Sequence, residues 1–160
     1  MLTPDLARLI NERNQHTLFS TLGMYLLPGE GDVLCAEMKC TERNCQPFGC
    51  LNGGANLAMA ETVTGMGSLL LAGPDEGVVG MQVSGNHLKT VQMGETVRAE
   101  CRILHRGRST HVWDVNIYNG VRQLVCTVRV CNYIVKLKDG EVNDFSQRKG
   151  PAAEHDRAEK

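Results

Sequence analysis

The chain has 160 residues, the usual length of one globular domain, and 42% of them are hydrophobic, which is enough for a substantial core. Its formal net charge of −1 excludes a strong overall field for nucleic acid or an anionic membrane. The longest strongly apolar stretch covers only residues 69–72, and a basic-then-apolar leader is missing. We therefore expect a cytoplasmic protein that neither spans a membrane nor binds nucleic acid.

The seven cysteines include no CxxC or CxxxC pair, which gives little support to a structural zinc site. They lie at positions 35, 40, 45, 50, 101, 126 and 131. Because small soft side chains are often buried in cytosolic proteins, we interpret them as thiols in the core and expect no metal site.

The first third of the chain predicts a helix, a strand and a second, longer helix. Residues 2–10 place leucine and isoleucine at helical spacing, and residues 32–40 alternate apolar and polar side chains as a half-buried strand does. Pro47 and Gly49 then interrupt the chain before residues 53–71. This run is long enough for about five helical turns.

The second half of the chain reads as four strands. Alternating apolar positions occur over four runs: 79–84, 96–103, 113–117 and 124–135. Asn119-Gly120 lies between the last two runs and predicts a type I′ hairpin that pairs them antiparallel. One strand, one long helix and a meander of four strands is an α+β order, and the long helix is the only element able to cover the sheet.

The predicted architecture is therefore a curved antiparallel sheet wrapped around the helix of residues 53–71. Glycine and alanine recur along this helix, which suits close approach of the two backbones. We expect one domain over residues 1–140 and a polar, disordered tail over residues 141–160.

Glu61 is the only charged residue between Arg43 and Ala72. A carboxylate on an enclosed helix is costly unless it is paired, exposed to a cleft or required for function. Two interpretations stay open from the pattern alone. The helix has one solvated side that carries Glu61, or Glu61 does chemistry.

Asn52, Gly53 and Gly54 open the same helix, where backbone amides and the helix dipole favour a developing negative oxygen. A plain turn before a capped helix explains the two glycines equally simply. Gly53 and Glu61 are eight residues apart, about 12 Å along a helix, so both cannot contact one carbonyl. Two antiparallel helices across a two-fold axis would bring the amide of one chain to the carboxylate of the other.

The run Gln46-Pro47-Phe48-Gly49-Cys50-Leu51-Asn52-Gly53-Gly54-Ala55, followed by Glu61, resembles the Q-P-F-G-x-x-H-G-G-A signature and downstream glutamate of hotdog-fold acyl-CoA thioesterases. Residues 85–89 and 104–113 are also similar to that family. Within it they look like the branch that acts on aryl thioesters such as 4-hydroxybenzoyl-CoA and 1,4-dihydroxy-2-naphthoyl-CoA. The resemblance covers roughly residues 16–135.

The resemblance implies a hotdog fold and hydrolysis of an acyl- or aryl-CoA thioester to the free acid and coenzyme A. Glu61 would be the nucleophile or the general base, and the Gly53 backbone amide and the Gln46 side chain would hold the thioester carbonyl. The thiolate is a good leaving group, so the reaction needs no strong general acid. No cofactor is implied, since coenzyme A is part of the substrate.

The other residues that the resemblance assigns fall into three groups. Asn52 takes the place of the family's usual histidine in the catalytic motif. The substrate-binding positions would be Gly54, Thr62, Gly65 and His87. The positions near the phosphates of coenzyme A would be Lys89, Arg106, Gly107, Arg108 and Ser109. The resemblance also implies a homodimer that pairs into a tetramer.

Two departures from the family pattern leave other functions open. Asn52 replaces the titratable histidine, and Gly65 stands where relatives often carry serine. A non-catalytic acyl-CoA binding module would tolerate both changes. A hotdog hydratase or dehydratase is the third hypothesis, although the His–Asp or His–Glu pair of such enzymes is not visible in the sequence.

Overall fold

The computed structural model describes residues 2–29, 31–138, 141 and 143, and shows one curved sheet around one long helix. The helices are α1 (Pro4–Arg13), α2 (Leu18–Thr21) and α3 (Gly53–Leu71). The strands are β1 (Met24–Leu26), β2 (Leu34–Lys39), β3 (Glu76–His87), β4 (Thr96–Arg106), β5 (Thr110–Tyr118) and β6 (Leu124–Lys136). The long helix has the bounds that the sequence predicted, and all four later strands are longer than predicted.

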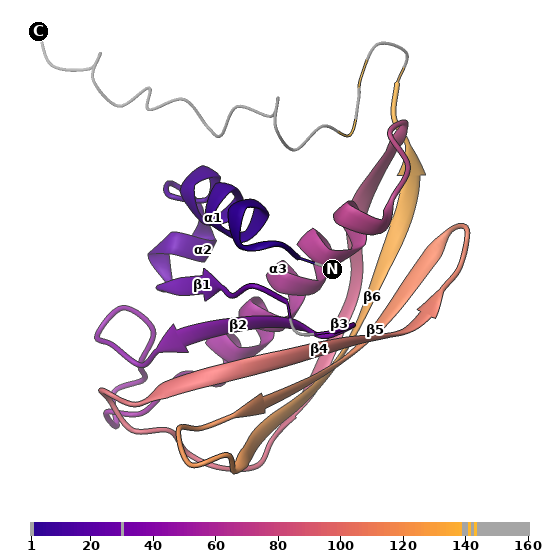
Figure 1. Cartoon of the computed structure of the whole chain (residues 1–160). Helices are drawn as coiled ribbons and strands as arrows, with labels where there is room; N and C mark the ends of the chain where they lie inside the picture. Colours follow the sequence, from indigo (N-terminus) through magenta and orange to yellow (C-terminus); the bar gives the residue numbers. More distant parts are fainter. Residues whose placement is uncertain (1, 30, 139–140, 142, 144–160) are drawn as a thin grey trace, which may run out of the picture.

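The six strands form one antiparallel sheet in the order β1-β2-β4-β5-β6-β3 (Figure 1). The sheet curves around α3, which contacts every strand from β2 to β6. The wrapped-sheet prediction is therefore confirmed. The prediction of a four-strand meander was wrong, because only β4, β5 and β6 are sequential neighbours and β3 pairs with β6 at the far edge. Within the part of the chain that the structure describes, one side of β3 is thus left without a neighbouring strand.

The core lies between α3 and the concave face of the sheet. Gly67 permits a close approach of helix and sheet, since a Cβ there would lie 2.9 Å from side-chain atoms of both Leu34 and Trp113. On the next residue, the Ser68 hydroxyl accepts hydrogen bonds from Trp113 Nε1 at 2.8 Å and from Asn132 Nδ2 at 3.0 Å. The C-terminal half of α3 is therefore held by packing and by buried hydrogen bonds together.

The hairpin between β5 and β6 differs from the predicted type I′ turn. Asn119 accepts from the backbone N–H of Arg122 at 2.9 Å, and Arg122 has a positive φ of 63° while Gly120 does not. This is a three-residue loop that ends in a left-handed residue. The antiparallel pairing of the two strands is as predicted. The turn type was wrong because the left-handed conformation falls on the arginine and not on the Asn-Gly pair.

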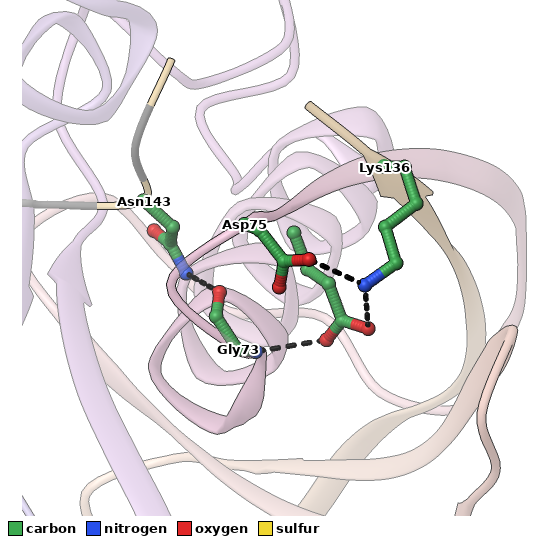
Figure 2. Close-up of polar contacts among 5 residues, drawn as sticks. Gly73, Asp75, Lys136 and Asn143 are labelled. Atoms are coloured by element: carbon green, nitrogen blue, oxygen red, sulfur yellow. Dashed lines mark hydrogen bonds and ion pairs between the residues drawn. The ribbon is translucent and has the colours of Figure 1, made fainter. Parts of the chain in front are cut away.

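The turn from α3 into β3 also holds the end of β6 (Figure 2). Lys136 Nζ lies 2.7 Å from Asp75 Oδ2 and 3.5 Å from Glu76 Oε1, and Glu76 Oε2 accepts from the Gly73 amide at 2.8 Å. Asn143 donates to the Gly73 carbonyl at 3.3 Å. The predicted tail of residues 141–160 otherwise lies outside the described residues.

The N-terminal region forms a small layer of its own next to β1. Helix α1 begins two residues later and ends three residues later than predicted, and neither α2 nor β1 was predicted. Both helices contact β1, as Figure 1 shows. Among the described residues no disulfide joins the cysteines. No described helix combines the length and the apolarity needed to cross a membrane.

Candidate active site

A cleft of about 330 Å³ lies at the N-terminus of α3, and we call it the α3 cleft. It is lined by Gln46, Leu51, Gly53, Asn56, His87, Leu88, Lys89 and Thr90. Four residues predicted for the site therefore come together from the loop before α3, from α3 itself and from the end of β3. Two further clefts, of about 290 and 460 Å³, lie beside α1 and beside the end of β2 and contain none of the predicted residues.

The start of α3 is capped by Asn52, whose Oδ1 accepts a hydrogen bond from the Gly54 amide at 2.8 Å. A side-chain oxygen at this position satisfies one of the amides that the first helical turn leaves unpaired. The remaining amides and the positive end of the helix dipole favour an anionic oxygen beside Gly53. Asn52 thus does structural work that the catalytic-motif prediction did not include.

His87 covers Gly53. A Cβ at Gly53 would lie 2.7 Å from His87 Nε2, so any larger residue would have to displace this imidazole. On the other side of the ring, Nδ1 lies 3.4 Å from Sγ of Cys126, which faces His87 across the β3–β6 pair. Burial raises the pKa of Cys126 to about 11, so this thiol stays protonated at neutral pH. Its contact holds the ring in place and does not supply a nucleophile.

Gln46 lies in a tight loop on the opposite side of the cleft. Its carbonyl accepts from the Gly49 amide at 3.0 Å, and Gly49 has a positive φ of 74°. Gln46 Nε2 donates to Cys50 Sγ at 2.8 Å. The backbone of Cys50 forms an isolated antiparallel β-bridge with Gln92. The glutamine side chain is therefore oriented by a buried thiol, and a hydrogen bond to sulfur is weak enough to be exchanged for one to a carbonyl oxygen.

Glu61 does not line the α3 cleft of its own chain, and its side chain is exposed. Of the two interpretations left open by the sequence, the single chain has Glu61 on a solvated side of the helix, because α3 reaches the sheet's last strand there and β3 has no further neighbour among the described residues. A Cβ at Gly80 of β3 would lie 2.9 Å from Glu61 Oε1, so the carboxylate rests on the glycine of this strand. The β-bulge between Gly80 and Gln82 lies at the same place.

The remaining predicted residues are divided between the cleft and the far end of α3. Thr62 and Gly65 follow Glu61 on α3, outside the cleft. Lys89 is exposed at the rim of the cleft. Arg106 donates to the Leu71 carbonyl at 2.7 Å, at the C-terminus of α3, and residues 107–109 connect β4 to β5 beside it. The single chain therefore does not bring Arg106, Gly107, Arg108 and Ser109 to the cleft.

Among the residues of the site that the sequence analysis missed, Asn56 and Cys126 matter most for its geometry. Asn56 is 5% exposed and lines the α3 cleft, and Cys126 orients His87. Asn56 lies three residues after Gly53, so helical spacing alone places it on the same face and could have found it. Nothing in the sequence signals Cys126, because it lies 39 residues after His87 and contacts it only through the pairing of β3 with β6.

A curved antiparallel sheet around one long helix, with a polar cleft at the helix N-terminus, defines a protein of the hotdog fold class. Thioesterase PA1618 from Pseudomonas aeruginosa, crystallised as a glutamine-to-alanine variant, superposes with a TM-score of 0.79 at 33% identity, covering 84% of this chain and 96% of that one. SAV0944 from Staphylococcus aureus has a TM-score of 0.71 at 35% identity, with 76% of this chain and 100% of that one covered. Two structures of it carry alanine in place of a glutamate and of a glutamine.

Sequence comparison leads to the same family. Residues 48–126 match the model described as "Thioesterase superfamily". The proofreading thioesterase EntH of Klebsiella pneumoniae is 36% identical over 76% of this chain and 88% of that protein. The 1,4-dihydroxy-2-naphthoyl-CoA hydrolase of Listeria monocytogenes is 35% identical over 76% of this chain and 97% of its own length. The chain belongs to the thioesterase superfamily, and it is a thioester hydrolase.

Proposed function

We propose that the protein hydrolyses acyl- or aryl-CoA thioesters in a site shared by two subunits, with Glu61 as the nucleophile or general base. The observation that carries this proposal is the division of the site within one chain. Gln46 and Gly53 line the α3 cleft, whereas Glu61 lies eight residues, or about 12 Å, further along the helix and outside it. A second copy is needed to bring a carboxylate to the cleft.

The open edge of the sheet favours such a copy. Beside Glu61, strand β3 exposes Val79 and Met81, which are 53% and 58% accessible. An apolar edge strand without a neighbour is unfavourable in water and offers unpaired backbone groups to another chain. Two copies joined along β3 by a two-fold axis would run their α3 helices antiparallel, and each Glu61 would then face the Gly53 end of the other helix.

The chemistry follows from this arrangement. The carbonyl oxygen of the thioester would accept from the Gly53 amide and from Gln46 Nε2, where the helix dipole stabilises the negative charge that develops. Glu61 of the second copy would then attack the carbonyl carbon or take a proton from an attacking water. In either route the carbon–sulfur bond breaks, the coenzyme A thiolate leaves and the acid is released after water has been consumed.

The relatives support both the substrate class and the catalytic pair. One relative is by name a CoA thioester hydrolase with an aromatic acyl group. In SAV0944 the glutamine and the glutamate replaced by alanine are 15 positions apart, which is also the separation of Gln46 and Glu61. This shared spacing favours a joint role for the two side chains in our protein.

Coenzyme A would extend from the cleft toward cationic groups of both copies. Lys89 is already at the rim. In the antiparallel arrangement, the second copy's helix continues for ten residues beyond its Glu61, about 15 Å, to Leu71 and the adjoining Arg106. Arg106, Gly107, Arg108 and Ser109 of that copy would then surround phosphate groups, which arginine binds in bidentate geometry. Two such dimers would form the expected tetramer.

The first test replaces the proposed catalytic acid. Glu61→Ala should lower kcat for a benzoyl-CoA or acyl-CoA substrate by about two to four orders of magnitude, because the group that activates the attack is lost. Thiol release measures the rate. Glu12→Ala, which removes an exposed glutamate from α1, is the control and should keep its turnover. Normal turnover by Glu61→Ala would disprove the assignment.

The second test asks whether two chains share the site. Glu61→Ala and Gln46→Ala are each impaired as homodimers, and their unfolded chains are mixed and refolded together. If the carboxylate comes from the other subunit, half of the dimers contain one intact site of two, and about a quarter of the wild-type activity returns. If each site lies within one chain, mixing restores nothing.

A further inference from the structure

Gly80 is a glycine that the backbone of β3 does not require. Its φ does not lie in the left-handed region, unlike that of Gly49. Glycine in the interior of a strand lowers stability, because it loses more conformational freedom on folding and has no side chain to pack. The neighbouring atoms give a reason for it. The nearest atom to a Cβ at Gly80 would be Glu61 Oε1, at 2.9 Å, and the next two nearest also belong to the Glu61 side chain.

The contact with Glu61 is one of three between β3 and a single side of α3. Gly53, Leu57 and Glu61 are spaced by four residues, so they lie on one side of the helix. A Cβ at Gly85 would lie 2.8 Å from Leu57 Cδ2, and His87 lies over Gly53. The strand therefore runs antiparallel to this side of the helix, from the carboxylate at one end to the helix N-terminus at the other.

The β-bulge in β3 makes this arrangement possible. Side chains of a regular strand alternate between its two faces, so Gly80 and His87, which are seven residues apart, would face opposite ways. Gly80 and Gln82 are paired with two consecutive residues of β6, so Met81 is an extra residue without a partner on that strand. The extra residue shifts the alternation by one position. Gly80 and His87 therefore both face α3.

We propose that Gly80 is a positioning residue for thioester hydrolysis: it leaves the space in which the Glu61 carboxylate rests, and the bulge turns this space toward α3. The inference rests on the proposed function, since it assumes that Glu61 is the catalytic group. A methyl group at position 80 cannot stay 2.9 Å from Oε1, because ordinary contact begins at 3.4 Å. The obstacle is the end of a flexible side chain, so the carboxylate moves and the strand keeps its place.

The experiment measures thiol release by the full-length protein from benzoyl-CoA or hexanoyl-CoA, whichever the wild type hydrolyses faster. Gly80→Ala should lower kcat by about 10- to 100-fold and leave KM within about twofold, because a small displacement of a catalytic group is costly while the groups that bind the thioester are untouched. Its melting temperature and its mass in solution should equal those of the wild type.

Gly77→Ala is the matched control on the same strand. A Cβ at Gly77 would also lie 2.9 Å from the end of a flexible side chain, in this case Leu137 Cδ2. It is distant from the bulge in sequence and does not contact Glu61. This variant should keep the wild-type kcat.

A double variant separates positioning of the carboxylate from an effect on the strand. Glu61→Gln keeps the shape of the side chain and removes its charge. Because Gly80 acts only through the carboxylate, adding Gly80→Ala to Glu61→Gln should change the residual kcat by less than about twofold.

Other outcomes overturn the proposal. A wild-type kcat in Gly80→Ala, while Glu61→Gln is impaired, would show that the carboxylate does not need the space. An equal loss in the Glu61→Gln background, a changed mass in solution or misfolding of Gly80→Ala would show that the glycine serves the strand or its free edge. Failure of the proposed function is distinguishable, since Glu61→Gln would then turn over like the wild type or the wild type would release no thiol.

Discussion

Single side chains at the start of α3 do several tasks at once. Asn52 stands in the motif at the start of the helix, and its Oδ1 also caps the helix by accepting a hydrogen bond from the Gly54 amide. Gly53 leaves room for the His87 ring, whose Nε2 would be 2.7 Å from a Cβ. The motif could be recognised from the sequence because it is local. The orientation of His87 by Cys126 could not, because it depends on the register of β3 and β6.

The buried His111 makes stability depend on pH. It is 3% exposed, and its Nδ1 has no hydrogen-bond partner among the described residues. Burial, followed by the charge of Arg106, lowers its pKa from the ordinary value of 6.5. The folded chain therefore keeps His111 neutral while the unfolded chain takes up a proton as the pH falls below 6.5. The free energy of unfolding should decrease as the pH falls from that value toward the lowered pKa, and change no further below it.

Urea unfolding between about pH 7.5 and about pH 5 measures this effect. His111→Gln should show a shallower decrease in stability than the wild type, whatever its absolute stability. His16→Gln removes an exposed histidine and should leave the slope unchanged. Parallel slopes for His111→Gln and the wild type would contradict the role of His111.

At the scale of elements, the glycines of α3 serve different needs. A Cβ at Gly67 would be 2.9 Å from Leu34 and Trp113, whereas a Cβ at Gly65 would meet nothing within 4 Å. Glycine in a helix interior costs about 0.5–1 kcal/mol relative to alanine. At Gly67 this loss of stability is offset because glycine permits close packing of helix and sheet. At Gly65 no neighbouring atom of the single chain explains why glycine is present.

Two matched substitutions test this difference. Gly67→Ala should destabilise the protein by about 1–3 kcal/mol through overpacking, and Gly65→Ala should stabilise the isolated fold by about 0.5–1 kcal/mol. Both follow from urea unfolding curves. Equal effects of the two variants would show that the close approach of α3 to Trp113 does not govern the packing. A loss of stability in Gly65→Ala alone would point to a contact between subunits at that position.

The sequence pattern predicted the helices and strands better than it predicted which strands lie side by side. Residues 53–71 formed the expected helix, because a long uninterrupted run of small and apolar residues has few alternatives. The order of the strands was less accessible. An alternating pattern assigns a face to each residue but says nothing about which strand lies beside it, so the displacement of β3 to the edge beyond β6 appeared only in three dimensions.

For the whole molecule, the proposed shared site requires that the exposed edge of β3 controls assembly and therefore activity. Substituting both Val79 and Met81 with lysine places charges along this edge, which natural proteins use to prevent strand pairing. We expect a monomer by sedimentation and a fall in kcat/KM of about 100-fold or more, because each cleft loses its carboxylate.

The control for this prediction is Val121→Lys. Val121 is 74% exposed in the loop between β5 and β6, so it is at least as accessible and does not lie on the free edge of β3. It should keep both the wild-type mass and the wild-type rate. A monomeric double variant with full activity would disprove the shared site.

The sequence by itself determined the long helix, the curved sheet around it and the thioesterase motif from Gln46 to Glu61, because these depend on periodicity and on residues that are close along the chain. The tertiary structure alone decided which of those residues share a cleft. Gln46, Gly53 and His87 come together only through the packing of three segments, and Glu61 is kept away from them by the rise of its own helix. It also showed Asn56 with its unpaired oxygen, since burial is a property of the folded chain and not of the residue.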